Sequence, residues 1–281
     1  MKLPVYFISH GGGPWPYIPA MQASNAALSA SLADIPKQIG NKPKAILMVS
    51  AHWETRGAFS VMSHPSPPML YDYYGFPEHT YQIQYRAPGA PALAQRVQQL
   101  LSNAGLPAGT DTARGFDHGA FVPAFVMYPE ADIPMTQLSI DAGYDPALHL
   151  ALGRALSPLR EEGVLIIGSG LSYHNLRQIY GGGAAASAQF DAWLQQVLLR
   201  SPVEQRAALL ERWETAPAAR LAHPREDHLI PLMVAAGAAE TEPVTCVYHE
   251  SQAFAGITAS SFRFGDITLP SERATANKVK V

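Results

Sequence analysis

Three histidines in this sequence each follow a short apolar run, and they are the side chains best suited to chemistry. They are His10 after VYFIS (residues 5–9), His52 within KAILMVSAHWE (residues 44–54) and His174 after VLIIGSGLSY (residues 164–173). Apolar runs of this length are typical of buried strands. Open α/β sheets bind their ligands at the carboxyl ends of such strands. Because imidazole is the commonest metal-binding side chain, three of them at matching strand ends predict a shared metal site.

A further ligand is expected in the segment PREDHLIPLM, residues 224–233. Pro224 suits the start of a helix, and Glu226 and Asp227 would lie in its first turn, as the helix dipole prefers. His228 would then lie early in this helix, within reach of the strand ends. Glu226 and Asp227 are alternatives, since two histidines and a carboxylate form the site of non-haem Fe(II) oxygenases. The spacing alone leaves this choice open.

Two glycine-rich segments also have other interpretations, both weaker. HGGG at residues 10–13 is similar to the oxyanion-hole motif of lipases and esterases, but these enzymes need a G-x-S-x-G nucleophile elbow. Around Ser169, Ile167 stands where the first glycine belongs. The dinucleotide-binding fingerprint fails at its third glycine, where this chain has Tyr173. The sequence therefore disfavours a serine hydrolase and a dinucleotide-dependent enzyme.

Strand and helix patterns alternate along the chain, which predicts an α/β fold. We expect a mostly parallel central sheet flanked by helices, in a single domain with the metal site at the strand carboxyl ends. Residues 1–270 would form this catalytic domain and residues 271–281 a polar C-terminal tail. Further strands are expected at residues 57–64, 133–140 and 244–248, helices at residues 20–32, 90–103, 147–156, 184–200 and 203–213, and a glycine-bracketed loop with His118 at residues 115–121.

Composition and charge restrict the partners. The formal net charge is −3 and the sequence contains no run of Lys or Arg, so we expect no nucleic-acid partner. The single cysteine, Cys246, cannot form an internal disulfide, which is consistent with a reducing compartment. The first residues do not resemble a signal peptide, and no segment approaches the ~20 apolar residues of a bilayer span. We therefore expect a cytoplasmic protein that acts on a small molecule, away from membranes.

The segment MLYDYYGFPEHTYQIQY, residues 69–85, is unusually rich in aromatic side chains. One interpretation is an irregular loop in which residues such as Tyr74 and Phe76 form the wall of a pocket for a flat ligand. The other is a surface loop held in place by its own aromatic contacts. The sequence favours neither.

Six segments, taken in their order, resemble the class III extradiol ring-cleavage dioxygenases (LigB-type), and most closely their 4,5-DOPA extradiol dioxygenase branch. Each segment is a weak signal alone, whereas the joint order is specific and extends over residues 5–240. The segments are HGGGP from His10, SAHW from Ser50, GFDHG from Gly115, PMTQLSI from Pro134, GSGLSYHNL from Gly168 and DHLIPL from Asp227.

The resemblance implies that a catechol, DOPA-like or related, is opened by O₂ at a mononuclear non-haem metal to a muconic semialdehyde-type product. It implies that His10 and His52 are metal ligands and that His228, rather than Glu226, is the third. His174 would be the acid/base beside the metal, or an additional ligand in the resting enzyme. His118 would lie near the oxygen site. The residues expected to contact the substrate are Gly12, Trp53, Tyr74, Phe76 and Tyr173.

The implied cofactor is Fe(II) for activity, with Zn(II) as a metal that the same site would also hold. The implied partners are the catechol and O₂. The sequence leaves the oligomeric state open between a monomer and a homo-oligomer. A zinc-dependent hydrolase that uses the same histidines is the alternative, because open histidine sites also activate water. Redox-inert zinc cannot support the O₂ chemistry, so the two functions are separable by their metal.

Overall fold

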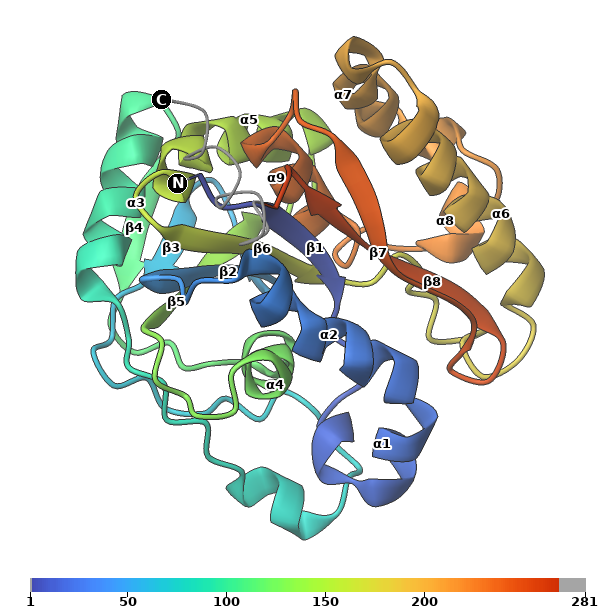
Figure 1. Cartoon of the computed structure of the whole chain (residues 1–281), viewed down its shortest axis with the longest axis horizontal. Helices are drawn as coiled ribbons and strands as arrows, with labels where there is room; N and C mark the ends of the chain where they lie inside the picture. Colours follow the sequence, from blue (N-terminus) through green and yellow to red (C-terminus); the bar gives the residue numbers. More distant parts are fainter. Residues whose placement is uncertain (1, 268–281) are drawn as a thin grey trace, which may run out of the picture.

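The computed structural model describes residues 2–267, and one eight-stranded sheet with helices on both faces organises them (Figure 1). The strand order is β4-β3-β5-β2-β6-β1-β8-β7. The predicted polar tail at residues 271–281 lies outside the described residues. The strands are β1 (Val5–Ser9), β2 (Ala45–Thr55), β3 (Phe59–Met62), β4 (Ala108–Asp111), β5 (Met135–Asp141), β6 (Val164–Gly170), β7 (Val244–Ala253) and β8 (Ile257–Phe264).

The centre of the sheet is parallel and its edges are mixed. Strands β5, β2, β6 and β1 run parallel to one another, and β3 runs parallel to β4. The pairs β3–β5, β1–β8 and β7–β8 are antiparallel. The expectation of a single-domain α/β fold is confirmed, although the sheet is mixed rather than uniformly parallel. Parallel central strands bring the carboxyl ends of β1, β2 and β6 to one edge of the sheet.

Two helical layers cover the sheet because successive side chains of a strand point to opposite faces. In β1, Val5 and Phe7 join the apolar layer under α3, α5, α6 and α9, whereas Tyr6 and Ile8 join the layer under α2 and α4. The helices are α1 (Pro19–Ser24), α2 (Ala26–Ile39), α3 (Pro91–Asn103), α4 (His118–Met127), α5 (Pro146–Leu156), α6 (Ala184–Gln195), α7 (Val203–Glu211), α8 (Ala219–Ala222) and α9 (Ile230–Ala238).

Two elements that carry histidines differ from the sequence predictions. Strand β2 does not end before His52 but continues to Thr55, and its register against β5 shifts between Val49 and Glu54. Such irregularities re-aim side chains and are common beside active sites. The predicted loop around His118 is instead the start of α4, because the Asp117 carboxylate accepts a hydrogen bond from the backbone N–H of Ala120 and caps the helix.

The helix predicted from Pro224 starts later. Helix α9 begins at Ile230, so His228 lies in the turn before it rather than in its first turns. The helix predicted at residues 20–32 is divided into α1 and α2 at Asn25. Strands β4 and β8 were not predicted, because their sequences AGTD and ITASSFRF contain too many small and polar residues to stand out as apolar runs.

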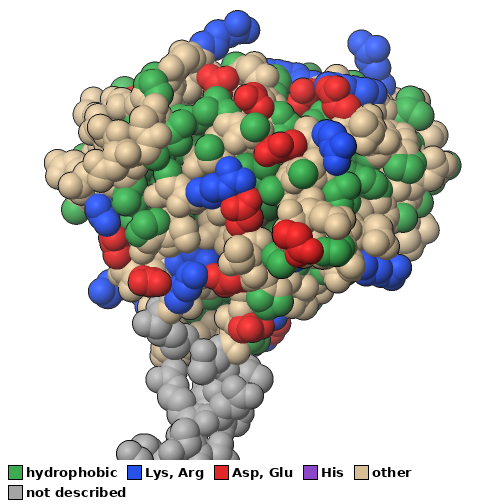
Figure 2. Space-filling view, turned by 90° about the horizontal axis from the view of Figure 1, so that it is seen from above, with side chains coloured by type: hydrophobic (Ala, Val, Ile, Leu, Met, Phe, Trp, Pro, Cys, Tyr) green, Lys and Arg blue, Asp and Glu red, His purple; other side chains and the backbone are tan. Residues whose placement is uncertain are grey.

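On the face shown in Figure 2, acidic and basic side chains are interspersed with apolar ones. Among residues 2–267, no helix has both the length and the apolar character needed to cross a bilayer.

Candidate metal centre

Five histidines from separate parts of the chain meet at the carboxyl ends of the central strands. The ring centroids of His10 and His52 are 4.9 Å apart, and that of His228 lies 5.2 Å from the first and 4.8 Å from the second. The ring of His118 is 4.0 Å from that of His52, and His174 stacks on His228 at 3.4 Å. All five side chains predicted to bind the metal or act beside it therefore lie in one cluster, here called the histidine centre.

Two glycines allow the turn with His228 to lie directly on β6. A Cβ added at Gly170 would meet the His228 carbonyl oxygen at 2.1 Å, and one at Gly168 would meet that of Pro231 at 2.2 Å. The backbone N–H of Leu171 then donates to the His228 carbonyl at 3.1 Å. The motif Gly168-Ser169-Gly170 is therefore a packing motif, which agrees with the rejection of a nucleophile elbow and a dinucleotide loop.

Ser169, between these glycines, determines the tautomer of His10. The Ser169 hydroxyl donates to the Gly119 carbonyl, so its oxygen accepts the proton of His10 Nδ1 at 3.1 Å. His10 therefore keeps a free lone pair on Nε2, and this atom lies 3.2 Å from Nε2 of His52. The proton assignment follows from the hydrogen-bond network.

Carboxylates face the Nδ1 atoms of three other imidazoles. His118 Nδ1 donates to Asp72 Oδ1 at 2.8 Å. Nδ1 of His52 lies 3.4 Å from Asp72 Oδ2, and Nδ1 of His228 lies 3.0 Å from Asp227 Oδ2, as charge contacts rather than hydrogen bonds. A proton on the Nδ1 of a ring leaves its Nε2 lone pair available. Metal-binding histidines typically direct their second nitrogen to a carboxylate or another hydrogen-bond acceptor in this manner.

Burial keeps the imidazoles of His10, His52 and His228 neutral. It lowers the pKa of His10 and His228 well below the ordinary value, and the neighbouring imidazoles lower it further. For His52, burial and then His118 lower the pKa to about 4. Neutral rings have the lone pairs that metal ions require. At neutral pH these three residues are therefore uncharged and able to bind a metal ion.

The spacing of these nitrogens fits a metal ion. Nε2 of His10 and Nε2 of His52 lie 3.2 Å apart. If both rings carry their proton on Nδ1, the two Nε2 lone pairs face each other and repel unless a cation lies between them. Neighbouring ligands with metal–nitrogen bonds of ~2.0–2.1 Å have a similar separation. A set of neutral imidazoles suits divalent iron or zinc. Two sets of ligand atoms have the spacing that a divalent ion needs: those of His10, His52 and His118, and those of His174, Asp227 and His228, each lie within 4.8 Å of one another.

The two aspartates that orient the rings remain ionised. Burial opposes ionisation of Asp72, but the hydrogen bond from His118 and the nearby imidazoles hold its pKa at about 2. Burial is likewise outweighed at Asp227, where His174 and His228 hold the pKa well below the usual range. The centre therefore combines neutral imidazoles with two carboxylates, which offset the charge of a divalent ion.

The histidine centre forms the floor of a cavity of about 460 Å³, here called the histidine pocket. Three of the predicted substrate contacts, Gly12, Tyr74 and Phe76, line it, which places the aromatic loop at the pocket wall. The other lining residues are Gly11, Gly13, Met21, Asp72, Tyr73, Leu171, Leu176, Ile179, Tyr180 and Phe254, besides the five histidines.

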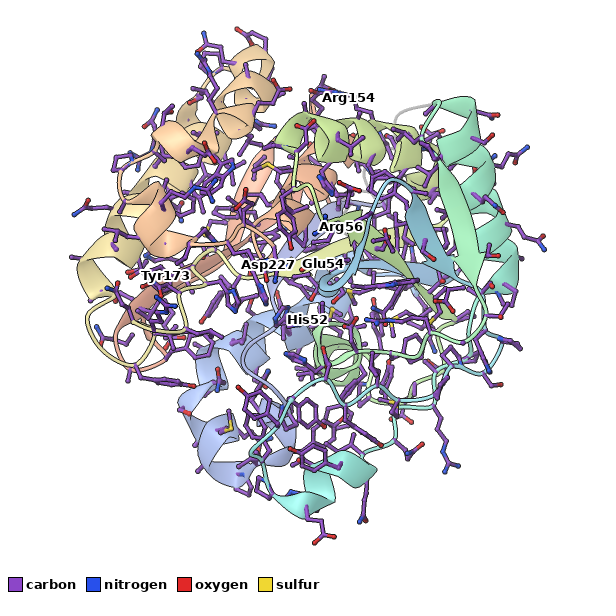
Figure 3. The ribbon with its side chains drawn as sticks, turned by 180° about the vertical axis from the view of Figure 1, so that it is seen from behind. His52, Glu54, Arg56, Arg154, Tyr173 and Asp227 are labelled. Carbon is purple, nitrogen blue, oxygen red and sulfur yellow. The ribbon has the colours of Figure 1, made fainter. Side chains whose placement is uncertain are left out.

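Two predicted substrate contacts, Trp53 and Tyr173, are not among the lining residues. Trp53 follows His52 in β2, so its side chain points to the other side of the strand; it is 6% exposed and packs under the Arg114 guanidinium. Tyr173 is 1% exposed in the apolar layer of α6, and Figure 3 shows it away from His52 and Asp227. Both aromatic rings support the core instead of facing the cavity.

The sequence interpretation missed Asp72, although it is the one acidic residue in the segment 69–77. It had considered Asp227 as a ligand, whereas the structure places this carboxylate behind the rings of His174 and His228. Glu226 is directed away and pairs with Arg220 at 2.6 Å. The carboxylate alternatives to His228 are therefore oriented as a ring partner and as a surface ion pair.

The fold and the site define a class of protein, an α/β protein with a polyhistidine pocket of the kind that holds a catalytic metal. Comparison with known proteins identifies the family within this class. Residues 4–265 match the family model described as the catalytic LigB subunit of aromatic ring-opening dioxygenase. The chain belongs to this family, and its activity is extradiol ring cleavage.

Individual relatives agree over most of their length. The chain is 41% identical to a 4,5-DOPA dioxygenase extradiol of Beta vulgaris, over 92% of this chain and 95% of that protein. It is also 41% identical to a protein of that name in Escherichia coli K12, over 73% of this chain and 76% of the relative. The crystal structure of an uncharacterized Escherichia coli K12 protein superposes with a TM-score of 0.72 at 32% identity, covering 94% of this chain and all of that one.

Proposed function

We propose that this protein cleaves the ring of a substituted catechol, DOPA-like or related, next to its two hydroxyl groups and inserts both atoms of O₂ to give a muconic semialdehyde. The observation that carries the proposal is the pair of Nε2 lone pairs on His10 and His52, 3.2 Å apart, beside His228. The names of the Beta vulgaris and Escherichia coli relatives suggest the substrate class. Residues 1–270 would be the catalytic domain.

His10, His52 and His228 would hold the metal through Nε2. A bound Fe(II) ion supplies the redox chemistry with O₂ and lowers the pKa of the catechol hydroxyls. Zn(II) would fit the same nitrogens but is redox-inert, so a zinc-loaded protein would be inactive in ring cleavage. Neutral rings, fixed by Ser169 and the two aspartates, would be arranged for the ion before it binds.

His174 is assigned the proton transfer. Its ring lines the pocket, stacks on His228 and is partly exposed, so it can reach a catechol hydroxyl. The Asp227 carboxylate lies 3.7 Å from its Nδ1 and would stabilise the ring once it has taken the proton. His174 would later return this proton to an oxygen of the product.

His118 and the aromatic wall complete the proposed site. Asp72 holds the His118 Nδ1 at 2.8 Å, which leaves Nε2 free to contact dioxygen or a catechol oxygen. Tyr74 and Phe76 would stack against the ring of the substrate and exclude water from it. The apolar wall therefore suits a flat aromatic substrate.

The experiment is anaerobic loading with Fe(II), followed by DOPA, caffeate or protocatechuate in air. We expect oxygen uptake, a yellow product and a mass gain of two oxygen atoms, with none of these after loading with Zn(II). Product spectra across the substrates would identify the bond cleaved. The zinc-dependent hydrolase is not favoured by the comparisons; ester or amide hydrolysis by the zinc protein without oxygen, and no oxygen uptake by the iron protein, would contradict the proposal.

A further inference from the structure

A second hollow adjoins the histidine pocket and has a different chemical character. It measures about 560 Å³ and shares His174 and Leu176 with the pocket, so the two spaces meet beside the proposed acid/base. Three arginines line it, Arg177, Arg220 and Arg225, and we call it the arginine groove. The ionised Asp227 carboxylate also lines it and lies 4.0 Å from the Arg225 guanidinium. Among the described residues that line the histidine pocket itself, none is an arginine or a lysine. Any anionic group on the substrate would therefore find its cation in the groove.

Two of these arginines already have carboxylate partners. Arg220 pairs with Glu226 at 2.6 Å and with Glu214. Arg225 pairs with Glu54 at 2.5 Å, and its guanidinium also lies over the Tyr144 ring. Their charges are largely offset by the protein. They are therefore not the groups best placed to bind a further anion.

Arg177 differs from both. Within residues 2–267 its guanidinium makes no ion pair and no hydrogen bond, although its backbone is held in place. The backbone N–H of Arg177 donates to Asn175 Oδ1 at 3.2 Å. The Asn175 side-chain amide in turn donates to the Leu221 carbonyl at 2.9 Å. The groove thus presents one uncompensated guanidinium from an anchored loop, three residues beyond His174.

We infer that Arg177 binds the carboxylate of a catechol that carries a short acidic side chain, and so selects arylalkanoate-type substrates over neutral catechols. A ring held against His174 with its side chain directed past Leu176 would bring the carboxylate into the groove. A guanidinium suits a carboxylate because it offers two parallel N–H donors. This inference rests on the proposed function, whose substrates carry such a chain.

The test compares 3-(3,4-dihydroxyphenyl)propanoate with its methyl ester, which has the same ring and nearly the same length but no charge. Binding to the iron-loaded protein is measured by calorimetry without oxygen, so that turnover is not required. We expect the wild type to bind the acid about 10-fold more tightly than the ester, and Arg177→Met to bind both equally. Arg177→Lys should keep part of the preference, because it keeps the charge.

Arg200→Met is the matched control, since Arg200 is also exposed and ends the π-helical segment Gln196–Arg200, outside the groove. It should leave the preference unchanged. A preference that persists in Arg177→Met, equal losses for acid and ester, or no preference or no binding in the wild type would overturn the inference. The proposed function fails separately, if acid and ester bind as expected but neither is cleaved when air is admitted.

Discussion

Two buried histidines in different regions of this molecule, His149 and His10, do different work. His149, in α5, is fully buried and burial lowers its pKa, as it does for His10 in the histidine centre. At His149, however, the protein uses both ring nitrogens: Nδ1 donates to the Asp145 carbonyl at 2.7 Å, and Nε2 accepts from the Asp141 N–H at 3.0 Å. At His10 only Nδ1 is used, and Nε2 faces His52. Burial and a lowered pKa therefore do not identify a ligand. His223, which is buried and has no partner at Nδ1, shows that an unused lone pair does not identify one either, unless other donors face the same point.

The strongest test of this comparison is to remove the histidines whose Nε2 atoms are expected to bind the metal. Alanine at His10, His52 or His228 should each reduce metal content and lower turnover to the background level, because each removes a nitrogen that would hold the metal. Plasma mass spectrometry and oxygen uptake would measure both. His79→Ala, at an exposed position, is the control. A variant of the three that kept its iron and activity would remove that residue from the ligand set.

A smaller effect is expected where a lone pair serves proton transfer. His174→Ala should lower kcat by ~10²–10⁴-fold, the usual contribution of general acid–base catalysis, and leave metal content nearly unchanged. Single-turnover rates and metal analysis on the same preparation separate the two effects. If the variant loses metal as completely as His52→Ala does, His174 is a ligand in the resting enzyme.

The carboxylate behind the rings should have a smaller effect again. Asp72→Asn keeps the size of the side chain but removes the charge that orients His52 and His118. We expect metal affinity or turnover to fall by ~10–100-fold, as is typical when a ligand loses its hydrogen-bonding partner. Competition with a chelator measures the affinity. Asp34→Asn, on exposed parts of α2, should change neither quantity.

The structural histidine should affect stability alone. His149→Gln would leave backbone groups at Asp141 and Asp145 poorly paired, which should cost ~1–3 kcal/mol of unfolding free energy at pH 7 with iron content and kcat unchanged. Urea unfolding of the wild type and the variant measures this difference in unfolding free energy. Lost metal or activity in this variant would erase the distinction between the two regions.

The same variant predicts a pH dependence. Burial lowers the His149 pKa, opposed by its hydrogen bond to Asp145 and by the carboxylates of Asp141 and Asp145. The stabilisation is therefore fully present above the unfolded value of ~6.5 and is lost as pH falls towards the folded pKa. The gap between wild type and His149→Gln should narrow from pH 7 to pH 5, by at most ~1.4 kcal/mol per pH unit below 6.5. A gap that widened would show that the ring is charged in the folded state.

The sequence predicted the strands and helices that have a strong residue pattern of their own. The apolar runs of β1, β2 and β6 identified the parallel centre of the sheet, and amphipathic periodicity identified α3. Strand β8 escaped because ITASSFRF is buried by neighbours far away in the chain rather than by a pattern of its own. The start of α9 was misplaced because the turn at His228 is held by its contact with β6.

For the site, the strand-end pattern selected His10, His52 and His174, because strands that end at one edge of a parallel sheet deliver their following residues together. His118, and the preference for His228 over Glu226, came from the family resemblance. Only the tertiary structure decided which ring nitrogens remain free. That depends on partners distant in sequence: Ser169 for His10, Asp72 for two further rings and Asp227 for the others. Whether a ring nitrogen keeps its lone pair free depends on which groups pack against the ring. The spacing of residues in the sequence does not specify those contacts.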